Sequence, residues 1–141
     1  MLLVPLTVGL LTSLVTTSTH CGLLSGLYWL MQHPRMLRQR RHAVLRMMLA
    51  MLIATTMLTL AHLLESAMWG AVYFNLHLVN TLPTAFFDAL LASTSLGFTF
   101  GNTASSWRLL EPMNTLNGIL LASMSAAIML RVLTLASQPR G

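Results

Sequence analysis

The residues that could carry out chemistry are few and far apart. The chain has 3 acidic residues and 5 histidines among its 141 residues, and only His62 and Glu65 form a close pair. Side chains three positions apart on a helix are neighbours, so these two can form a hydrogen bond. A structural metal site needs about four ligands, which this pair does not supply. The pair therefore predicts a polar contact and no metal site.

A second feature is a loop-like stretch that combines hydroxyl groups with glycines. Its members are Thr94, Ser95, Leu96, Gly97, Phe98, Thr99, Phe100 and Gly101. Glycine reaches positive φ and leaves room for close approach to an axis. A row of backbone carbonyls aimed at a shared axis can replace the hydration shell of an ion. The stretch therefore predicts an ion-coordinating loop, provided that other elements hold it at the right depth.

Enzyme chemistry finds no support in the motifs of this chain. The sequence has no Gly-x-Ser-x-Gly elbow, no His-Glu-x-x-His pair and no phosphate-binding glycine loop. Three carboxylates far apart in sequence offer little for general acid–base catalysis. Cys21 is the single cysteine, so an intramolecular disulfide is impossible. We therefore expect no enzymatic activity and no cofactor.

The composition indicates an all-α integral membrane protein. Hydrophobic residues make up 55% of the chain and charged residues only 8%, whereas soluble domains carry about 25% charged residues. All 8 basic residues are arginines, and five of them lie in the interval 35–46. A basic cluster between apolar runs usually sets membrane topology, so this cluster does not indicate nucleic-acid binding.

Three apolar runs are long enough to cross a bilayer, which requires roughly 20 helical residues. They predict transmembrane helices over about 2–31, 43–73 and 109–135 in a single membrane domain 1–141, with an arginine-rich loop at 32–46. Trp69 and Tyr73 near the end of the second run are typical of an aromatic belt at the membrane interface.

Small residues in the first run suit close helix packing. They include Gly9, Gly22 and Gly26. Because such residues let backbones approach, we expect this first helix to pack closely against the others.

A fourth stretch, about 83–102, is different, because its apolar part is too short to span. Pro83 can occupy the first turn of a short helix that follows Thr81 or Leu82. A short helix and a glycine-containing loop between two full spans make a re-entrant layout. Non-helical backbone survives at membrane depth only when it is buried in protein or lines water. One such loop cannot enclose a pore, so the layout predicts a homo-oligomer.

The order and spacing of several short motifs resemble those of the small bacterial potassium channel family, in the two-helix pore-loop superfamily, with an extra N-terminal helix. The matching pieces are His62-Leu63-Leu64-Glu65, Trp69, Tyr73, Ala85-Phe86-Phe87, Thr94-Ser95-Leu96-Gly97-Phe98, Trp107-Arg108-Leu109-Leu110-Glu111 and Leu116-Asn117-Gly118-Ile119-Leu120. The resemblance implies a tetramer whose four filter loops, residues 94–101, line a pathway for monovalent cations, K⁺ above all.

The filter departs from the family pattern Thr-Thr-Leu-Gly-Tyr-Gly-Asp. In an ungapped alignment Thr99 replaces the second glycine, where a β-branched residue would be strained at positive φ. In the other alignment two residues are inserted, and Phe100-Gly101-Asn102 stands for Tyr-Gly-Asp. Both alignments remain compatible with the sequence.

Residues outside the filter have two interpretations each. Glu65 is either a buried partner behind the filter or pore helix, or an interfacial carboxylate near the membrane surface. Asp88 either braces the filter or is simply favoured by the helix dipole. Ser123 and Ala127 either line an inner cavity or make packing contacts.

Charge also predicts orientation. The arginine-rich loop and the C-terminus should be cytoplasmic and the N-terminus outside, in a multi-pass protein of the cell inner membrane. The function that follows is passive cation conduction by a tetramer in contact with membrane lipid. The alternative is a non-conducting assembly protein or channel subunit that keeps the pore-loop fold.

Overall fold

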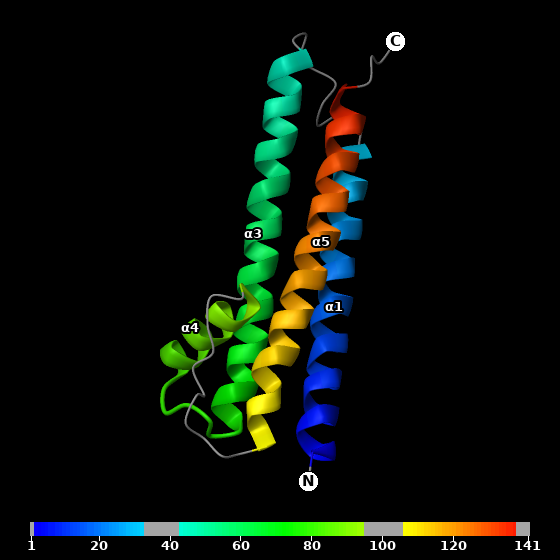
Figure 1. Ribbon diagram of the computed structural model, residues 1–141. Coiled ribbons are helices and arrows are strands. Elements are labelled where there is room, and N and C mark those ends of the chain that lie inside the picture. Colours follow the sequence, from blue (N-terminus) through cyan, green and yellow to red (C-terminus); the bar gives the residue numbers. More distant parts are fainter. Residues whose placement is uncertain (1, 33–42, 95–105, 138–141) are drawn as a thin grey trace.

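The computed structural model describes residues 2–32, 43–94 and 106–137, and these ranges contain helices and no strand. The helices are α1 (Leu3–Gln32), α3 (Ala43–Asn75), α4 (Leu82–Ser93), the 3-10 helix η1 (Ser106–Leu109) and α5 (Leu110–Ser137). Figure 1 shows α1, α3 and α5 as three long helices side by side, with α4 set against one end of α3 and α5. The three long helices and α4 occupy the stretches in which the sequence predicts them.

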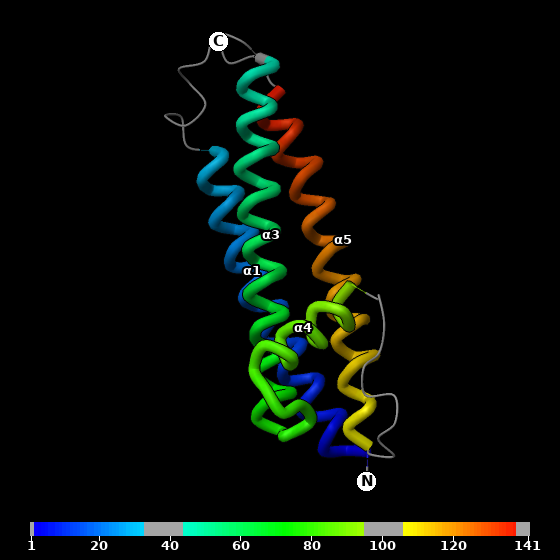
Figure 2. The backbone as a smooth tube through the Cα atoms, turned by 90° about the vertical axis from the view of Figure 1, so that its left-hand side faces the viewer, coloured from blue at the N-terminus to red at the C-terminus, as the bar shows by residue number. Residues whose placement is uncertain are grey.

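The directions of the three long helices determine which helix ends meet at each end of the bundle. α1 and α5 run in one direction and α3 runs in the other (Figures 1 and 2). α1 ends, α3 begins and α5 ends at one end. The N-terminus and α4 lie at the other.

Two helical stretches, Val44–Asn75 and Ser106–Ser137, are long and apolar enough to cross a membrane. α1 does not meet that criterion, and its centre carries the hydroxyl run Thr16–Thr19 and His20. The outer surfaces of all three long helices are nonetheless apolar. Large hydrophobic side chains exposed on them include Leu10, Leu14, Leu52, Leu60, Leu116, Leu120 and Leu130. Extended apolar surface of this kind is typical of contact with lipid or with another protein.

α4 begins as the sequence predicts. Thr81 is its N-cap in extended conformation (φ −134°, ψ 147°), its hydroxyl accepts a hydrogen bond from the Thr84 amide at 3.4 Å, and Pro83 sits in the first turn. Just before it the chain turns through His77, which has a φ of 55°. This turn folds α4 back alongside α3, from whose end the chain has just emerged.

The interior has two parts of different chemistry. At the end away from α4, the aliphatic end, the buried residues are Leu27, Met31, Ala50, Ala54, Leu58, Val132 and Ala136. At the other, the α4 end, they are Trp69, Tyr73, Ala85, Ala89 and Leu110. Trp69 and Tyr73 do not point outward as residues that face a membrane interface would, because their side chains are only 1% and 0% exposed. They fill the interior where α4 packs on α3 and α5.

α4 approaches both neighbours at backbone distance, and glycine makes this possible. A Cβ on Gly70 of α3 would lie 2.9 Å from Cα of Phe86, and a Cβ on Gly118 of α5 would collide with the carbonyl of Ser93. In α1, Gly9 makes the predicted close contact, with Met113, whereas a Cβ added at Gly22 or Gly26 would have nothing within 4 Å. Within the described part of this chain, Gly22 and Gly26 therefore make no close helix contact.

Candidate functional site

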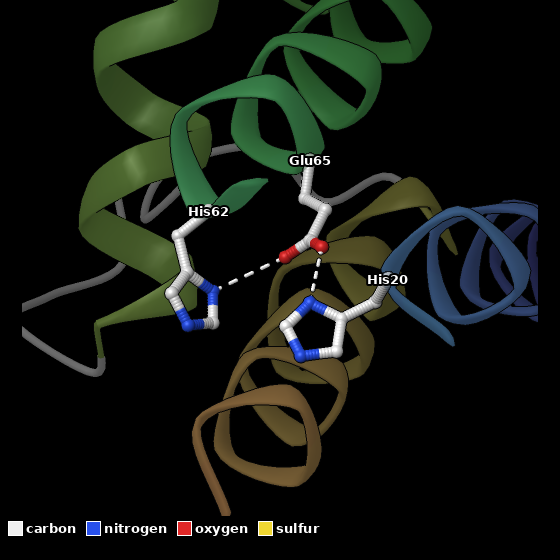
Figure 3. Close-up of side chains that lie close together, drawn as sticks. All are labelled: His20, His62 and Glu65. Carbon is white, nitrogen blue, oxygen red and sulfur yellow. Dashed lines mark hydrogen bonds and ion pairs between the residues drawn. The ribbon is translucent and has the colours of Figure 1, made fainter. Parts of the chain in front are cut away.

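A closed ring of four polar side chains lies in the middle of the bundle. His20 comes from α1, His62 and Glu65 from α3, and Ser125 from α5. His20 Nδ1 lies 2.6 Å from Glu65 Oε1, and His62 Nδ1 lies 3.1 Å from Glu65 Oε2. Ser125 Oγ closes the ring, at 3.2 Å from His20 Nε2 and 3.1 Å from His62 Nε2. Figure 3 shows the two imidazoles converging on the carboxylate. Each of the four side chains therefore makes two hydrogen bonds within the ring.

The ring is almost sealed from the outside. His20, Glu65 and Ser125 are buried, and His62 is half-buried. The two imidazoles stand close together, with ring centroids 5.3 Å apart. Polar groups withdrawn from water must find partners inside the protein, because an unpaired one costs several kcal/mol (roughly 2–7). The ring meets this requirement, since its four side chains satisfy one another across three helices.

Two imidazoles and a carboxylate are also ligand types that zinc accepts. Among the described residues, His20, His62 and Glu65 are a group whose ligand atoms lie within 4.8 Å of one another. Two ligands of one tetrahedral zinc ion, at about 2.0–2.2 Å from it, stand about 3.3 Å apart. The 2.6 Å between His20 Nδ1 and Glu65 Oε1 is shorter than that and is a hydrogen-bond distance. As arranged here, the ring holds protons between its atoms.

A cavity of about 390 Å³ adjoins the ring between α3, α5 and the end of α4. His62 and Glu65 reach it from one side, and Thr94 from the other. Trp69 and Asn114 line the cavity, and each has one buried polar atom, the indole Nε1 and Oδ1, that finds no hydrogen-bond partner among the described residues.

The end of α4 is fixed by hydrogen bonds to α5. Asn114 Nδ2 donates to the Ala89 carbonyl at 3.0 Å and to the Tyr73 hydroxyl at 3.1 Å. Thr115 Oγ1 donates to the Ala92 carbonyl at 2.7 Å. Carbonyls in the last turns of a helix have no partner within the helix. Thr115 of α5 thus satisfies a carbonyl that α4 leaves open at its end, and Asn114 adds a further hydrogen bond to the Ala89 carbonyl.

α1 is joined to α5 by a second polar contact one turn from the ring. Asn117 Nδ2 donates to Thr16 Oγ1 at 2.8 Å, and Thr17 Oγ1 donates to Asn117 Oδ1 at 3.2 Å. Asn117 also lines the cavity. α1 therefore contacts the bundle through paired polar groups at its centre as well as through apolar packing.

The structure describes only some of the predicted site residues. Of the filter stretch, only Thr94 is described: it ends α4, and its hydroxyl donates to the carbonyls of Leu90 and Leu91. Ser95, Leu96, Gly97, Phe98, Thr99, Phe100 and Gly101 lie outside the described residues. Asp88 is buried in the middle of α4. Ser123 and Ala127 lie on a face of α5 that no described helix covers.

Glu65 is buried, which removes the interfacial interpretation, and the predicted hydrogen bond with His62 is present. Sequence reasoning missed that His20 is the second partner of Glu65. The available signal was an ionisable residue within an apolar run, which by itself marks a functional candidate. It also missed Asn114 and Asn117, whose amides stand one turn apart in the last apolar run.

Comparison with known proteins finds no matching family model, no similar curated protein and no similar solved structure. The family resemblance of the motifs therefore stays a prediction.

Proposed function

We propose that this chain is the subunit of a homotetrameric membrane channel for monovalent cations, with α3, α4 and α5 as the pore unit and α1 as an additional span. The observation that carries the proposal is the course of α4. This 12-residue helix begins after the six residues that follow α3 and finishes beside Gly118, in the first third of α5. It lies against α3 and α5, runs from one end of the bundle toward the middle, and its last residues line a cavity (Figure 2).

The position of the α4 terminus supports a cation pathway. The C-terminal end of a helix carries partial negative charge, equivalent to about half an electron. Here that end lies at the depth of the buried ring and faces a cavity. The 11 residues between Thr94 and Ser106, at the start of η1, include the proposed filter.

The uncovered face of α5 supports assembly. Ser123, Ala126 and Ala127 are exposed there, next to the exposed Leu120 and Leu130. In a tetramer this face has two roles: the small residues line the inner cavity, and the leucines contact neighbouring subunits and lipid. A chain with one re-entrant segment needs partner copies to surround a pore.

Orientation follows from the arginines. α1 ends, α3 begins and α5 ends at one end of the bundle. In the sequence, the arginine-rich interval 35–46 follows α1 and extends into the start of α3, and Arg140 follows α5. The positive-inside rule makes this end cytoplasmic and puts α4 on the outer side of the inner membrane.

The decisive experiment is ion flux from liposomes that contain the purified protein, with K⁺, Na⁺ and a large organic cation compared. We expect K⁺ flux with exclusion of the large cation, from a particle whose mass corresponds to four chains. Flux of all three cations would support a pore and contradict its selectivity for K⁺. Absence of flux in a fourfold particle would favour the non-conducting assembly protein, and a monomer would end the proposal.

The two filter alignments give a second experiment. In the ungapped alignment, Thr99→Gly restores the second glycine of the family pattern and is expected to raise the ratio of K⁺ to Na⁺ flux. In the inserted alignment, Gly101 already has that role, so Thr99→Gly leaves the ratio unchanged and Gly101→Ala lowers it. A matched control is Gly22→Ala, because Gly22 has nothing within 4 Å.

A further inference from the structure

The ring of His20, His62, Glu65 and Ser125 contains four hydrogen bonds, and each of them requires one proton. A serine hydroxyl carries one proton, a neutral imidazole carries one, and a carboxylate carries none. A carboxylate, two neutral imidazoles and a hydroxyl therefore supply three protons. The closed ring needs four, one more than its ordinary forms provide.

The extra proton can be placed on either of two groups, and both placements give the ring the same total number of protons. In the first, one imidazole is protonated on both nitrogens and Glu65 is a carboxylate. In the second, Glu65 is a carboxylic acid and both imidazoles are neutral. The two have the same number of protons and differ only in which heavy atom each proton is bonded to. In both, the serine hydroxyl donates to one Nε2 and accepts from the other Nε2–H.

We propose that these four side chains form a buried proton-binding site, occupied by one proton shared around the ring, and that this proton holds α1 against α3 and α5. The effect of this proton on the net charge of the ring supports the proposal. The carboxylate with two neutral imidazoles has a net charge of −1, and the extra proton makes the ring neutral. An uncompensated charge inside a membrane protein is strongly unfavourable, so the neutral form is the stable one.

Loss of the proton affects one hydrogen bond directly. With three protons in the ring, one of the four contacts must join two acceptors. A net negative charge then also remains among buried groups. Because the ring is made by three helices, either effect weakens the attachment of α1. The proposal therefore predicts that the stability contributed by the ring is present at low pH and lost as the pH rises.

No other charged group takes the place of the ring proton among the described residues of these helices. The remaining titratable residues described on the packed helices are Cys21 and Tyr28 on α1, Arg46 and Tyr73 on α3, Asp88 on α4, and Glu111 and Arg131 on α5. Cys21 is exposed although it adjoins His20. Arg46 donates to the Ala136 carbonyl, at the far end of the bundle. Arg131, the nearest basic residue on α5, is six residues from Ser125, about 9 Å along the helix, and is exposed.

The ring also has a route for proton exchange. His62 and Glu65 are both part of the wall of the 390 Å³ cavity. A proton can therefore reach the site from the cavity while His20 stays fully enclosed. This proposal does not depend on ion conduction, because it concerns the packing of α1 within one chain.

Glu65→Gln is the most informative variant. A glutamine amide offers one acceptor and one donor to the two Nδ1 atoms, so it closes the ring with two neutral imidazoles and no extra proton. We expect the unfolding temperature of the wild type in detergent micelles to fall by about 4 °C or more between neutral and alkaline pH, the size expected for one buried hydrogen bond. We expect that of Glu65→Gln to stay constant over the same interval.

Two serine variants make the test independent of Glu65. Ser125→Thr keeps the hydroxyl and should keep the pH dependence, whereas Ser125→Ala opens the ring and should reduce it. An equal alkaline decline in the wild type and in Glu65→Gln would overturn the proposal. So would a zinc-induced rise in the unfolding temperature that abolishes the pH dependence, because it would identify a metal site.

Nuclear magnetic resonance provides a count of the protons themselves. With His33→Asn, His42→Asn and His77→Asn as background, only the two ring histidines remain. Imidazole ¹⁵N and glutamate carboxyl ¹³C signals of this protein in bilayers should show one proton in excess at neutral pH, as an imidazolium or as a carboxylic acid. Two neutral imidazoles beside a carboxylate would overturn the proposal.

Discussion

The two ends of the bundle are held together by different interactions. At the aliphatic end, Leu27, Ala54 and Val132 pack by shape, and Arg46 of α3 donates a hydrogen bond to the Ala136 carbonyl of α5. From the ring to the α4 end, Asn114, Asn117 and Thr115 join helices by side-chain hydrogen bonds. In lipid the surroundings of a helix are as apolar as its neighbour, so close packing and hydrogen bonds must replace the hydrophobic effect. The comparison teaches that side-chain hydrogen bonds between helices are more frequent where α4 packs on α3 and α5 and where α1 meets them at the ring.

Gly118→Ala should have the largest effect on the α4 end. The added methyl group collides with the backbone carbonyl of Ser93, which no side-chain rotation can relieve. We expect a loss of about 3 kcal/mol or more in the free energy of unfolding, measured in mixed detergent micelles, together with loss of flux. Gly22→Ala is the control. An unchanged Gly118→Ala protein would mean that α4 does not sit against α5.

Asn114→Leu is expected to have the next largest effect on the α4 end. It removes the amide that donates to the Ala89 carbonyl and to the Tyr73 hydroxyl, two hydrogen bonds worth about 0.5–1.5 kcal/mol each. Faster hydrogen exchange confined to the amides of α4 is the expected observation. Asn75→Leu, at an exposed site whose amide bonds only within its own helix, should leave α4 exchange unchanged. Equal exchange in both variants would contradict the proposed anchoring of α4.

Val132→Ala probes the aliphatic end. Truncation of this fully buried side chain should cost about 1 kcal/mol by loss of packing. It should change neither the flux nor the pH dependence of stability, because no polar group is disturbed. Leu130→Ala, at a site 69% exposed, is the control for stability. A change in ion selectivity in Val132→Ala would remove the functional distinction between the two ends.

Thr17→Val has the smallest expected effect. It removes the hydroxyl that donates to Asn117 Oδ1 and keeps the side-chain shape. Hydrogen bonds between membrane helices average about 0.6 kcal/mol, so a change of that size is expected. Thr7→Val, whose hydroxyl bonds only to its own helix, serves as comparison in the same unfolding assay. A loss above that of Asn114→Leu would show that α1 has the stronger polar attachment.

Much of the fold could be predicted because it depends on local signals. The lengths of the apolar runs give the three long helices. Thr81 and Pro83 give the start of α4 within one residue. The same signals say nothing about which face of a helix is inside when every face is apolar. Trp69 and Tyr73 were therefore predicted at the membrane interface although they are buried.

The candidate site was only half predictable. His62 and Glu65 meet because they are three residues apart, which sequence shows directly. His20 is 45 residues from Glu65 and 105 from Ser125, and only the packing of three helices brings them together. Gly9 and Gly22 look alike in sequence, yet one contacts Met113 and the other contacts nothing. Long-range pairing of this kind is a property of tertiary structure.

The wide separation of the ring partners along the chain has a consequence for biosynthesis. A ribosome makes His20 well before Glu65 and long before Ser125, at about 5–20 residues per second. His20 therefore meets its partners in two stages, Glu65 first and Ser125 several seconds later. The full set of contacts around α1 exists only after the last helix has been made.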